Sequence, residues 1–184
     1  MDSEDDSLAA PDRSEIHQEL DLACATFHAL LRAAAAADLR RPSDGTRWTN
    51  RQLLFHMLFG YLIVRRLLPL VRLFDRLPEP ASRTFSAVLN SVTRPFHAVN
   101  YFGSWGGGTV LTRRRMHAMM NRSIEVLQRR LDAETEGDLR RRMHFPPGWD
   151  PFFRDTMTLR DVYHYGTEHF EFHRRQLTLP NSPG

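Results

Sequence analysis

The chain has 184 residues, with 22 acidic side chains against 25 basic ones, and all 25 are arginine. The absence of lysine excludes a Walker-type phosphate loop and a pyridoxal phosphate enzyme, since both depend on a lysine side chain. The single cysteine, Cys24, excludes an intrachain disulfide and a multi-cysteine zinc or iron–sulfur site. A formal net charge of only +3 gives no support for nucleic-acid binding, and nine histidines remain as the main source of chemistry.

The ends of the chain and its most apolar run bear on domain organisation and location. Residues 1–12 are acidic and predict a disordered tail, and they lack the basic and apolar regions of a signal peptide. A single domain is expected over residues 13–179, a length that suits one core, with a short C-terminal tail at 180–184. The apolar run 53–64 is shorter than the roughly 20 residues that span a bilayer. We therefore expect no membrane segment and a cytoplasmic location.

Helix signals dominate the remainder of the chain, and no strand is predicted. Thr49 and Gln52 have the spacing of a capping box at the start of one helix, and Thr158 and Asp161 have it at the start of another. Pro69 predicts a kink or a stop in the former. The long helices, which together predict an all-α four-helix bundle, are expected at 14–39, 49–68, 109–131 and 158–177.

An insertion separates the second and third of these helices. Residues 81–108 are expected to add a short helix that ends in a flexible glycine-rich loop at 102–108. This loop lacks both the lysine and the strand–loop–helix context of a phosphate-binding site. We therefore assign it to chain flexibility.

Two histidines near the C-terminus have the spacing of a metal-chelating pair. His169 and His173 are four residues apart, which leaves their side chains about 40° apart on one helical face. His56, in the apolar run of the second helix, is the best candidate for a third ligand. Three neutral imidazoles around a divalent ion leave a coordination position for water or substrate. By spacing alone, hydrogen-bonded structural histidines remain the alternative.

Two segments resemble the DinB/YfiT-like superfamily of metal-binding proteins. They are residues 47–56, RWTNRQLLFH, and residues 157–177, which begin MTLRD and end HFEFHRRQL. In that family the second helix follows a Trp-Ser/Thr pair and carries a metal-binding histidine. The resemblance implies a four-helix bundle of up-down-down-up topology. It also implies a divalent metal held by His56, His169 and His173, with zinc expected and nickel or iron as alternatives.

Known activities in the family imply a thiol-dependent enzyme. The resemblance implies an S-transferase or isomerase that uses mycothiol, bacillithiol or glutathione, with the metal activating the thiol or water. A thiol cofactor with carboxylate groups requires cations near the pocket, and Arg47 and Arg51 are the candidates, with a solvated surface as the alternative. Expected partners are a small-molecule thiol and an electrophile. The oligomeric state stays open, with a homodimer as one alternative.

Residues around the histidines have two further expected roles. Gln176 is a candidate to support a histidine N–H, with a hydrogen bond inside the bundle as the favoured alternative. The aromatic segment with Trp149, Phe152 and Phe153 is a candidate roof over the pocket, with ordinary core packing at the end of the bundle as the alternative. The alternative function is a non-catalytic metal-binding or stress-related interaction protein on the same bundle.

Overall fold

The computed structural model describes the backbone of residues 3–180 and the side chains of residues 13–180. This part of the chain is mostly helical, which confirms the predicted all-α class. The expected domain limits stay a prediction. Of the tail 1–12, only the backbone from Ser3 onward is described, as the start of the first helix. Residues 181–184 of the C-terminal tail lie outside the described residues.

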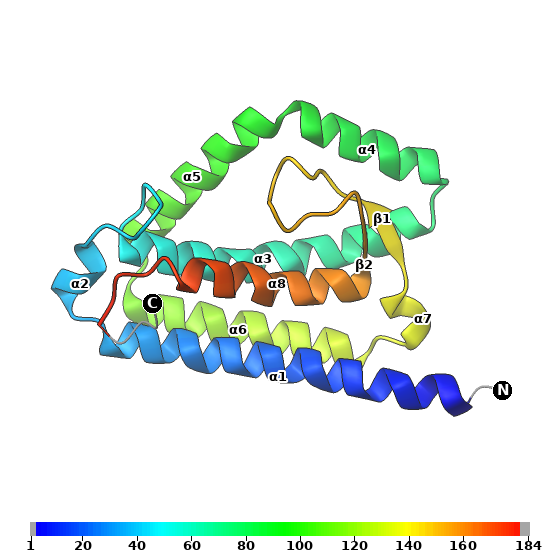
Figure 1. Ribbon diagram of the computed structural model, residues 1–184, viewed down its shortest axis with the longest axis horizontal. Helices are drawn as coiled ribbons and strands as arrows, with labels where there is room; N and C mark the ends of the chain where they lie inside the picture. Colours follow the sequence, from blue (N-terminus) through cyan, green and yellow to red (C-terminus); the bar gives the residue numbers. More distant parts are fainter. Residues whose placement is uncertain (1–2, 181–184) are drawn as a thin grey trace.

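Four long helices lie side by side (Figure 1): α1 (Ser3–Ala33), α3 (Asn50–Asp75), α6 (Arg113–Asp132) and α8 (Leu159–Arg174). Helix α3 packs against α6 and α8, and α1 packs against the same two helices. Helices α1 and α8 run in one direction, whereas α3 and α6 run in the other (Figure 1). Buried apolar side chains recur every three or four residues, as on amphipathic helices: Ile16, Leu20, Ala23 and Phe27 on α1, and Met116, Met120, Ile124 and Leu127 on α6.

Two further helices form an arch over α3. Helix α4 (Glu79–Ser91) and helix α5 (Thr93–Val110) follow one another along the top of Figure 1, and α5 packs against α3. The loop between two short strands, β1 (Arg142–His144) and β2 (Thr156–Thr158), lies beneath this arch. The short connecting helices are α2 (Ala36–Arg40) and α7 (Glu136–Leu139).

The two strands show that the prediction of a chain without strands is wrong. They pair antiparallel, with Met143 opposite Met157, and both methionine side chains are buried. Strands of three residues have too few positions to show the alternation by which a strand is recognised in a sequence. The hairpin matters for the site because it fixes both ends of the loop beneath the arch.

The glycine-rich stretch 102–108 belongs to helix α5, so its prediction as a flexible loop is also wrong. The glycines allow α5 to approach α3 closely. A Cβ atom on Gly108 would lie 2.5 Å from the Cα of Gln52, and one on Gly107 would overlap the ring of Phe55. Gly106, by contrast, has nothing within 4 Å of where its Cβ would be. Close helix packing, rather than chain flexibility, is the role of Gly107 and Gly108.

This packing predicts opposite effects of alanine at two neighbouring glycines. We expect Gly108→Ala to lower the free energy of unfolding by about 1–3 kcal/mol, because the added methyl group meets the backbone of α3. Gly106→Ala should instead raise it by about 0.5–1 kcal/mol, since alanine favours helix. Urea unfolding measures both changes. Equal stabilisation by the two variants would show that α5 is not docked in this way.

Helix α3 is the central helix, and its beginning is as predicted. Thr49 and Gln52 exchange capping contacts in both directions, and the helix then continues through Pro69 to Asp75. Thr158 and Asp161 form the second predicted capping box. Helix α3 is long and apolar enough to cross a membrane by composition, since an 18-residue stretch of it has a mean hydropathy of 1.5, but 56% of that stretch is buried inside the molecule. Such burial is typical of the core helix of a soluble protein.

Candidate metal centre

The three histidines singled out in the sequence meet between α3 and α8. His56 is in the middle of α3, and His169 and His173 are on successive turns of α8, which packs against α3. Their nearest ring nitrogens all lie within 4.8 Å of one another, and the Nε2 atoms of His56 and His169 are 3.2 Å apart. Two imidazole nitrogens bound to one zinc ion at about 2.0–2.1 Å lie at a similar separation.

Hydrogen bonds on the outer nitrogens orient two of these rings. The Nδ1–H of His173 donates to Oε1 of Gln176 at 2.7 Å, because an amide oxygen can only accept. Nδ1 of His56 lies 3.0 Å from the hydroxyl of Ser104 on α5. With the proton on Nδ1, each ring turns the lone pair of Nε2 toward the cluster. Such outer partners usually fix the tautomer of metal-binding histidines.

Burial keeps the three imidazoles neutral. It lowers the pKa of His56 to about 3, and the repulsion that a protonated His173 would exert lowers it further. The pKa values of His169 and His173 are also lowered, in both cases mainly by burial. Neutral imidazole is the form that binds a metal ion. The cluster therefore offers three lone pairs and no charge, which suits a divalent cation.

The ring of His169 occupies space that a glycine leaves open. A Cβ atom on Gly60 would lie only 2.6 Å from Nδ1 of His169. This nitrogen is buried and has no hydrogen-bond partner among the described residues. Leaving a buried polar atom unpaired costs about 1–3 kcal/mol. The fold thus gives up stability to hold this ring against α3, as is common at functional sites.

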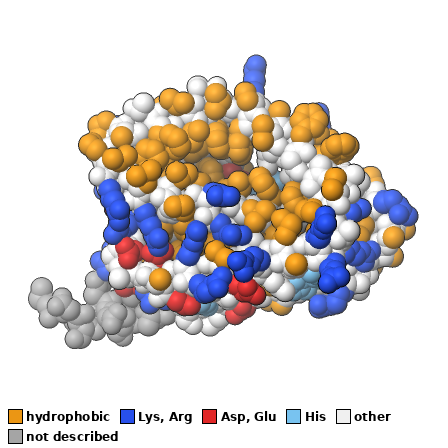
Figure 2. Space-filling model, turned by 180° about the vertical axis from the view of Figure 1, so that it is seen from behind, with side chains coloured by type: hydrophobic (Ala, Val, Ile, Leu, Met, Phe, Trp, Pro, Cys, Tyr) orange, Lys and Arg blue, Asp and Glu red, His pale blue; other side chains and the backbone are white. Residues whose placement is uncertain are grey.

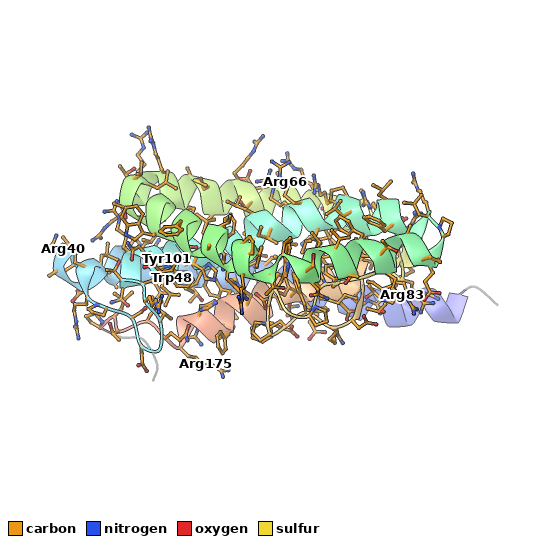
Figure 3. The ribbon with its side chains drawn as sticks, turned by 90° about the horizontal axis from the view of Figure 1, so that it is seen from above. Arg40, Trp48, Arg66, Arg83, Tyr101 and Arg175 are labelled. Atoms are coloured by element: carbon orange, nitrogen blue, oxygen red, sulfur yellow. The ribbon has the colours of Figure 1, made fainter. Side chains whose placement is uncertain are left out.

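Aromatic rings cover one side of the triad. The indole of Trp48 lies 4.4 Å from the ring of His56 and 6.4 Å from that of His173, measured between centroids. Tyr101 of α5 stacks on the outer side of Trp48, and Figure 3 shows the two side chains next to each other. The triad is therefore shielded from solvent on this side.

An apolar cavity of about 120 Å³ adjoins the triad, and His56 and His169 are among its lining residues. Its walls come from α3, α5, α8 and the loop between β1 and β2, and Phe96 stacks on Trp149 with centroids 3.8 Å apart. The lining residues are His56, Phe59, Gly60, Ile63, Arg66, Leu67, Phe96, Asn100, Trp149, Asp150, Phe153, Tyr165 and His169.

Asp150 brings a carboxylate to the triad, a contribution that the sequence did not reveal. Its Oδ2 lies 3.9 Å from Nε2 of His169 and accepts a hydrogen bond of 3.0 Å from the hydroxyl of Tyr165. Burial raises the pKa of Asp150. The residue lies in the loop between β1 and β2, where no periodic pattern marks it. Only its position after the aromatic Trp149, in a segment predicted to roof the pocket, gave a signal.

A comparison with known protein families agrees with this geometry. The model of the DinB superfamily matches residues 19–177, a stretch that contains all three histidines and both segments on which the resemblance was based. The chain belongs to the DinB superfamily. Membership and the histidine cluster together fit a metal-binding DinB-like protein. Neither the curated proteins nor the solved structures contain a match to it.

The two arginines proposed to bind a cofactor are not brought to the cavity of this DinB superfamily member. The Nη2 of Arg51 donates to the backbone oxygen of Leu111 at 2.7 Å and so ties α3 to the end of α5. Arg47 is exposed, and neither arginine is among the residues that line the cavity. Arg66 lines it instead.

The aromatic side chains of the segment predicted as a roof have two different roles. Trp149 and Phe153 line the cavity. Phe152 packs against Phe172 of α8, with ring centroids 5.5 Å apart. Two of the three aromatic side chains therefore close the pocket of this DinB-like protein, and the third anchors the loop.

Gln176 provides a test of how the triad is oriented. We expect Gln176→Leu to weaken zinc binding by about tenfold, because His173 loses the acceptor that holds its Nδ1–H outward. Gln18→Leu makes the same chemical change on the exposed face of α1 and should have no effect. Competition titrations against a chromophoric chelator measure both affinities. Equal affinities in the two variants would show that Gln176 does not orient the ring.

Proposed function

We propose that the protein is a divalent-metal-dependent enzyme, a thiol S-transferase or isomerase of the mycothiol, bacillithiol or glutathione type. The observation that carries the proposal is a triad of neutral imidazoles, His56, His169 and His173, beside a largely apolar cavity. We also propose that the bundle has the up-down-down-up topology that the family resemblance implies. The directions of the four long helices in Figure 1 support this.

The triad residues would hold the metal, and the cavity residues would hold what reacts. When bound at this position, a divalent ion would lower the pKa of a coordinated thiol or water and so supply a nucleophile at neutral pH. His173 and His56 are oriented for this by Gln176 and Ser104. The apolar walls exclude bulk water from the reacting groups. Zinc suits three imidazoles and an open position, and nickel or iron is the alternative.

The position of Cys24 and the raised pKa of its thiol favour a nucleophile that comes from outside the chain. It lies between α1 and α6, where its Sγ is 3.5 Å from Nε2 of His28 and 3.5 Å from Oδ1 of Asn121. Burial, followed by the charges of Asp21 and Glu125, raises the pKa of this thiol. A protonated thiol away from the cavity is a poor nucleophile. The thiol in the proposed reaction is therefore that of a small molecule.

The proposal includes partners and location. We place the protein in the cytoplasm, with a thiol and an electrophile as partners and without nucleic acid or membrane. A homodimer through the arch is part of the proposal. Figure 2 shows hydrophobic side chains gathered over the upper half of the molecule, where the arch lies, and arginines below. The exposed apolar residues of the arch are Val88, Val92, Val99, Phe102, Trp105 and Val110.

A conjugation screen tests the proposed reaction. Untagged protein loaded with zinc is incubated with mycothiol, bacillithiol or glutathione and a panel of electrophiles, and free thiol is followed with time. We expect consumption of one of these thiols that stops when zinc is chelated or His173 is replaced by alanine. Full zinc occupancy without consumption of any thiol would favour the alternative, a non-catalytic metal-binding protein.

A further inference from the structure

The triad supplies lone pairs for a metal ion but no negative charge. Its three imidazoles are neutral, so a divalent ion held by them alone would bring two uncompensated positive charges into the fold. A charge moved from water into a protein interior is costly unless an opposite charge lies nearby. A carboxylate next to the triad would offset this cost.

Asp150 is the one acidic residue among the described residues that line the cavity beside the triad. Its Oδ2 lies 3.9 Å from Nε2 of His169, the nitrogen that also faces His56. An ion bound to this nitrogen at about 2.0–2.1 Å would lie within about 6 Å of the carboxylate oxygen. Opposite charges at such a separation attract one another strongly where water is largely excluded.

The fold holds the carboxylate of Asp150 in this position. The hydroxyl of Tyr165 donates to Oδ2 at 3.0 Å, and the backbone N–H of Phe152 donates to Oδ1 at 3.0 Å. Tyr165 is four positions before His169 on α8, so one face of this helix carries both the histidine and the donor to the carboxylate. Hydrogen-bond donors of this kind stabilise the ionised form of a carboxyl group. The carboxylate therefore has its place beside the triad before any ion binds.

Asp150 would act on a bound ion from outside the ligand set. It is not a member of the group whose ligand atoms all lie within 4.8 Å of one another. The three imidazoles are thus the groups that would bind the ion, and the carboxylate would act through space. Because the Coulomb energy is proportional to charge, such a carboxylate attracts a divalent ion about twice as strongly as a monovalent ion at the same place.

We propose that Asp150 makes the triad selective for divalent over monovalent metal ions. Three neutral imidazoles offer lone pairs to either kind of ion, whereas the charge of Asp150 distinguishes between them. Asp150 is thus a specificity-determining residue that acts through its charge and needs no bond to the ion. The inference rests on the metal centre of the proposed function, because an ion has to bind at the triad.

Competition titrations with Zn²⁺ and, under anaerobic reducing conditions, with Cu⁺ test this proposal. Imidazole binds both ions. The protein is untagged and carries Cys24→Ser throughout, because Cu⁺ also prefers thiolate ligands. Asp150→Asn keeps the size of the side chain and an oxygen acceptor for Tyr165, and it removes the charge. We expect this variant to bind Zn²⁺ about thirtyfold more weakly and Cu⁺ only about fivefold more weakly.

Two further variants control for other effects. Asp155→Asn removes a charge from the same loop, at a side chain that is 78% exposed, and it should change neither affinity. Asp150→Glu keeps the charge. The ratio of its Zn²⁺ affinity to its Cu⁺ affinity should therefore stay within about twofold of the original, even where both affinities fall.

Three results would overturn the proposal. Unchanged Zn²⁺ affinity in Asp150→Asn would show that the charge does not act on the ion. Equal losses for Zn²⁺ and Cu⁺ would show that Asp150 only holds the loop in place. A similar loss in Asp155→Asn would assign the effect to the general field of the protein. Failure of the metal centre itself is distinguishable, because the chain with Asp150 intact would then bind no Zn²⁺, or bind it unchanged after His173→Ala.

Discussion

Replacing His173 by alanine is expected to lower the affinity of the protein for zinc by more than about a hundredfold. Loss of an outer partner of a metal ligand already costs 10- to 100-fold, and this change removes a ligand itself. His173 is partly exposed, so the variant should keep its fold. His56→Ala should have the same effect on zinc binding. Competition titration of untagged protein gives the affinities, and circular dichroism checks the helical content.

The control for this result is a histidine away from the cluster. His97 is exposed on α5 and is not a member of the triad, so His97→Ala should bind zinc as the unaltered chain does. If the His173 and His56 variants kept full affinity, the three rings would be structural. In that case, the hydrogen bond between His56 and His169 would explain why they meet.

Replacing Arg72 by methionine is expected to lower the free energy of unfolding by about 3 kcal/mol. Arg72 of α3 pairs with Glu134, whose side chain is only 1% exposed, and Tyr163 donates to the same carboxylate at 3.4 Å. Without Arg72 this carboxylate stays buried with the tyrosine hydroxyl as its remaining side-chain partner. Urea unfolding measures the loss. The double variant Arg72→Met, Glu134→Leu should recover most of it, because no buried charge then remains.

An exposed ion pair serves as the comparison. Arg83 and Glu79 pair on α4 with both side chains 69% exposed, and Figure 3 shows Arg83 at the edge of the molecule. Arg83→Met should cost less than about 1 kcal/mol, since solvent screens such a pair. A loss in Arg72→Met as small as this would mean that Glu134 finds water or another partner, and that the pair does not hold α3 to the α6–α7 connection.

Local signals explain which parts of the fold were predictable. The capping boxes at Thr49 and Thr158 depend on residues three positions apart, so the sequence alone locates both helix starts. The glycines at 102–108 mislead for the opposite reason. The role of Gly107 and Gly108 depends on Phe55 and Gln52, some fifty residues earlier in the chain, and a local pattern contains no trace of that contact.

The candidate site, too, was predictable only where a local signal marks its residues. The four-residue spacing of His169 and His173, the place of His56 in an apolar helix and the family resemblance were together enough to predict the cluster that the structure shows. Ser104 could not be predicted as a partner of His56, because its place depends on α5 being a helix docked on α3. Asp150 and Arg66 reach the cavity only through tertiary packing of a loop and of the far end of α3.

The most direct test of the metal centre is a crystal of the untagged protein soaked in zinc and recorded at the zinc absorption edge. We predict one anomalous peak per chain, with nitrogens of His56, His169 and His173 at about 2.0–2.1 Å from it. No peak at the triad in the presence of excess zinc, or a peak only at other side chains, would contradict the proposed metal centre.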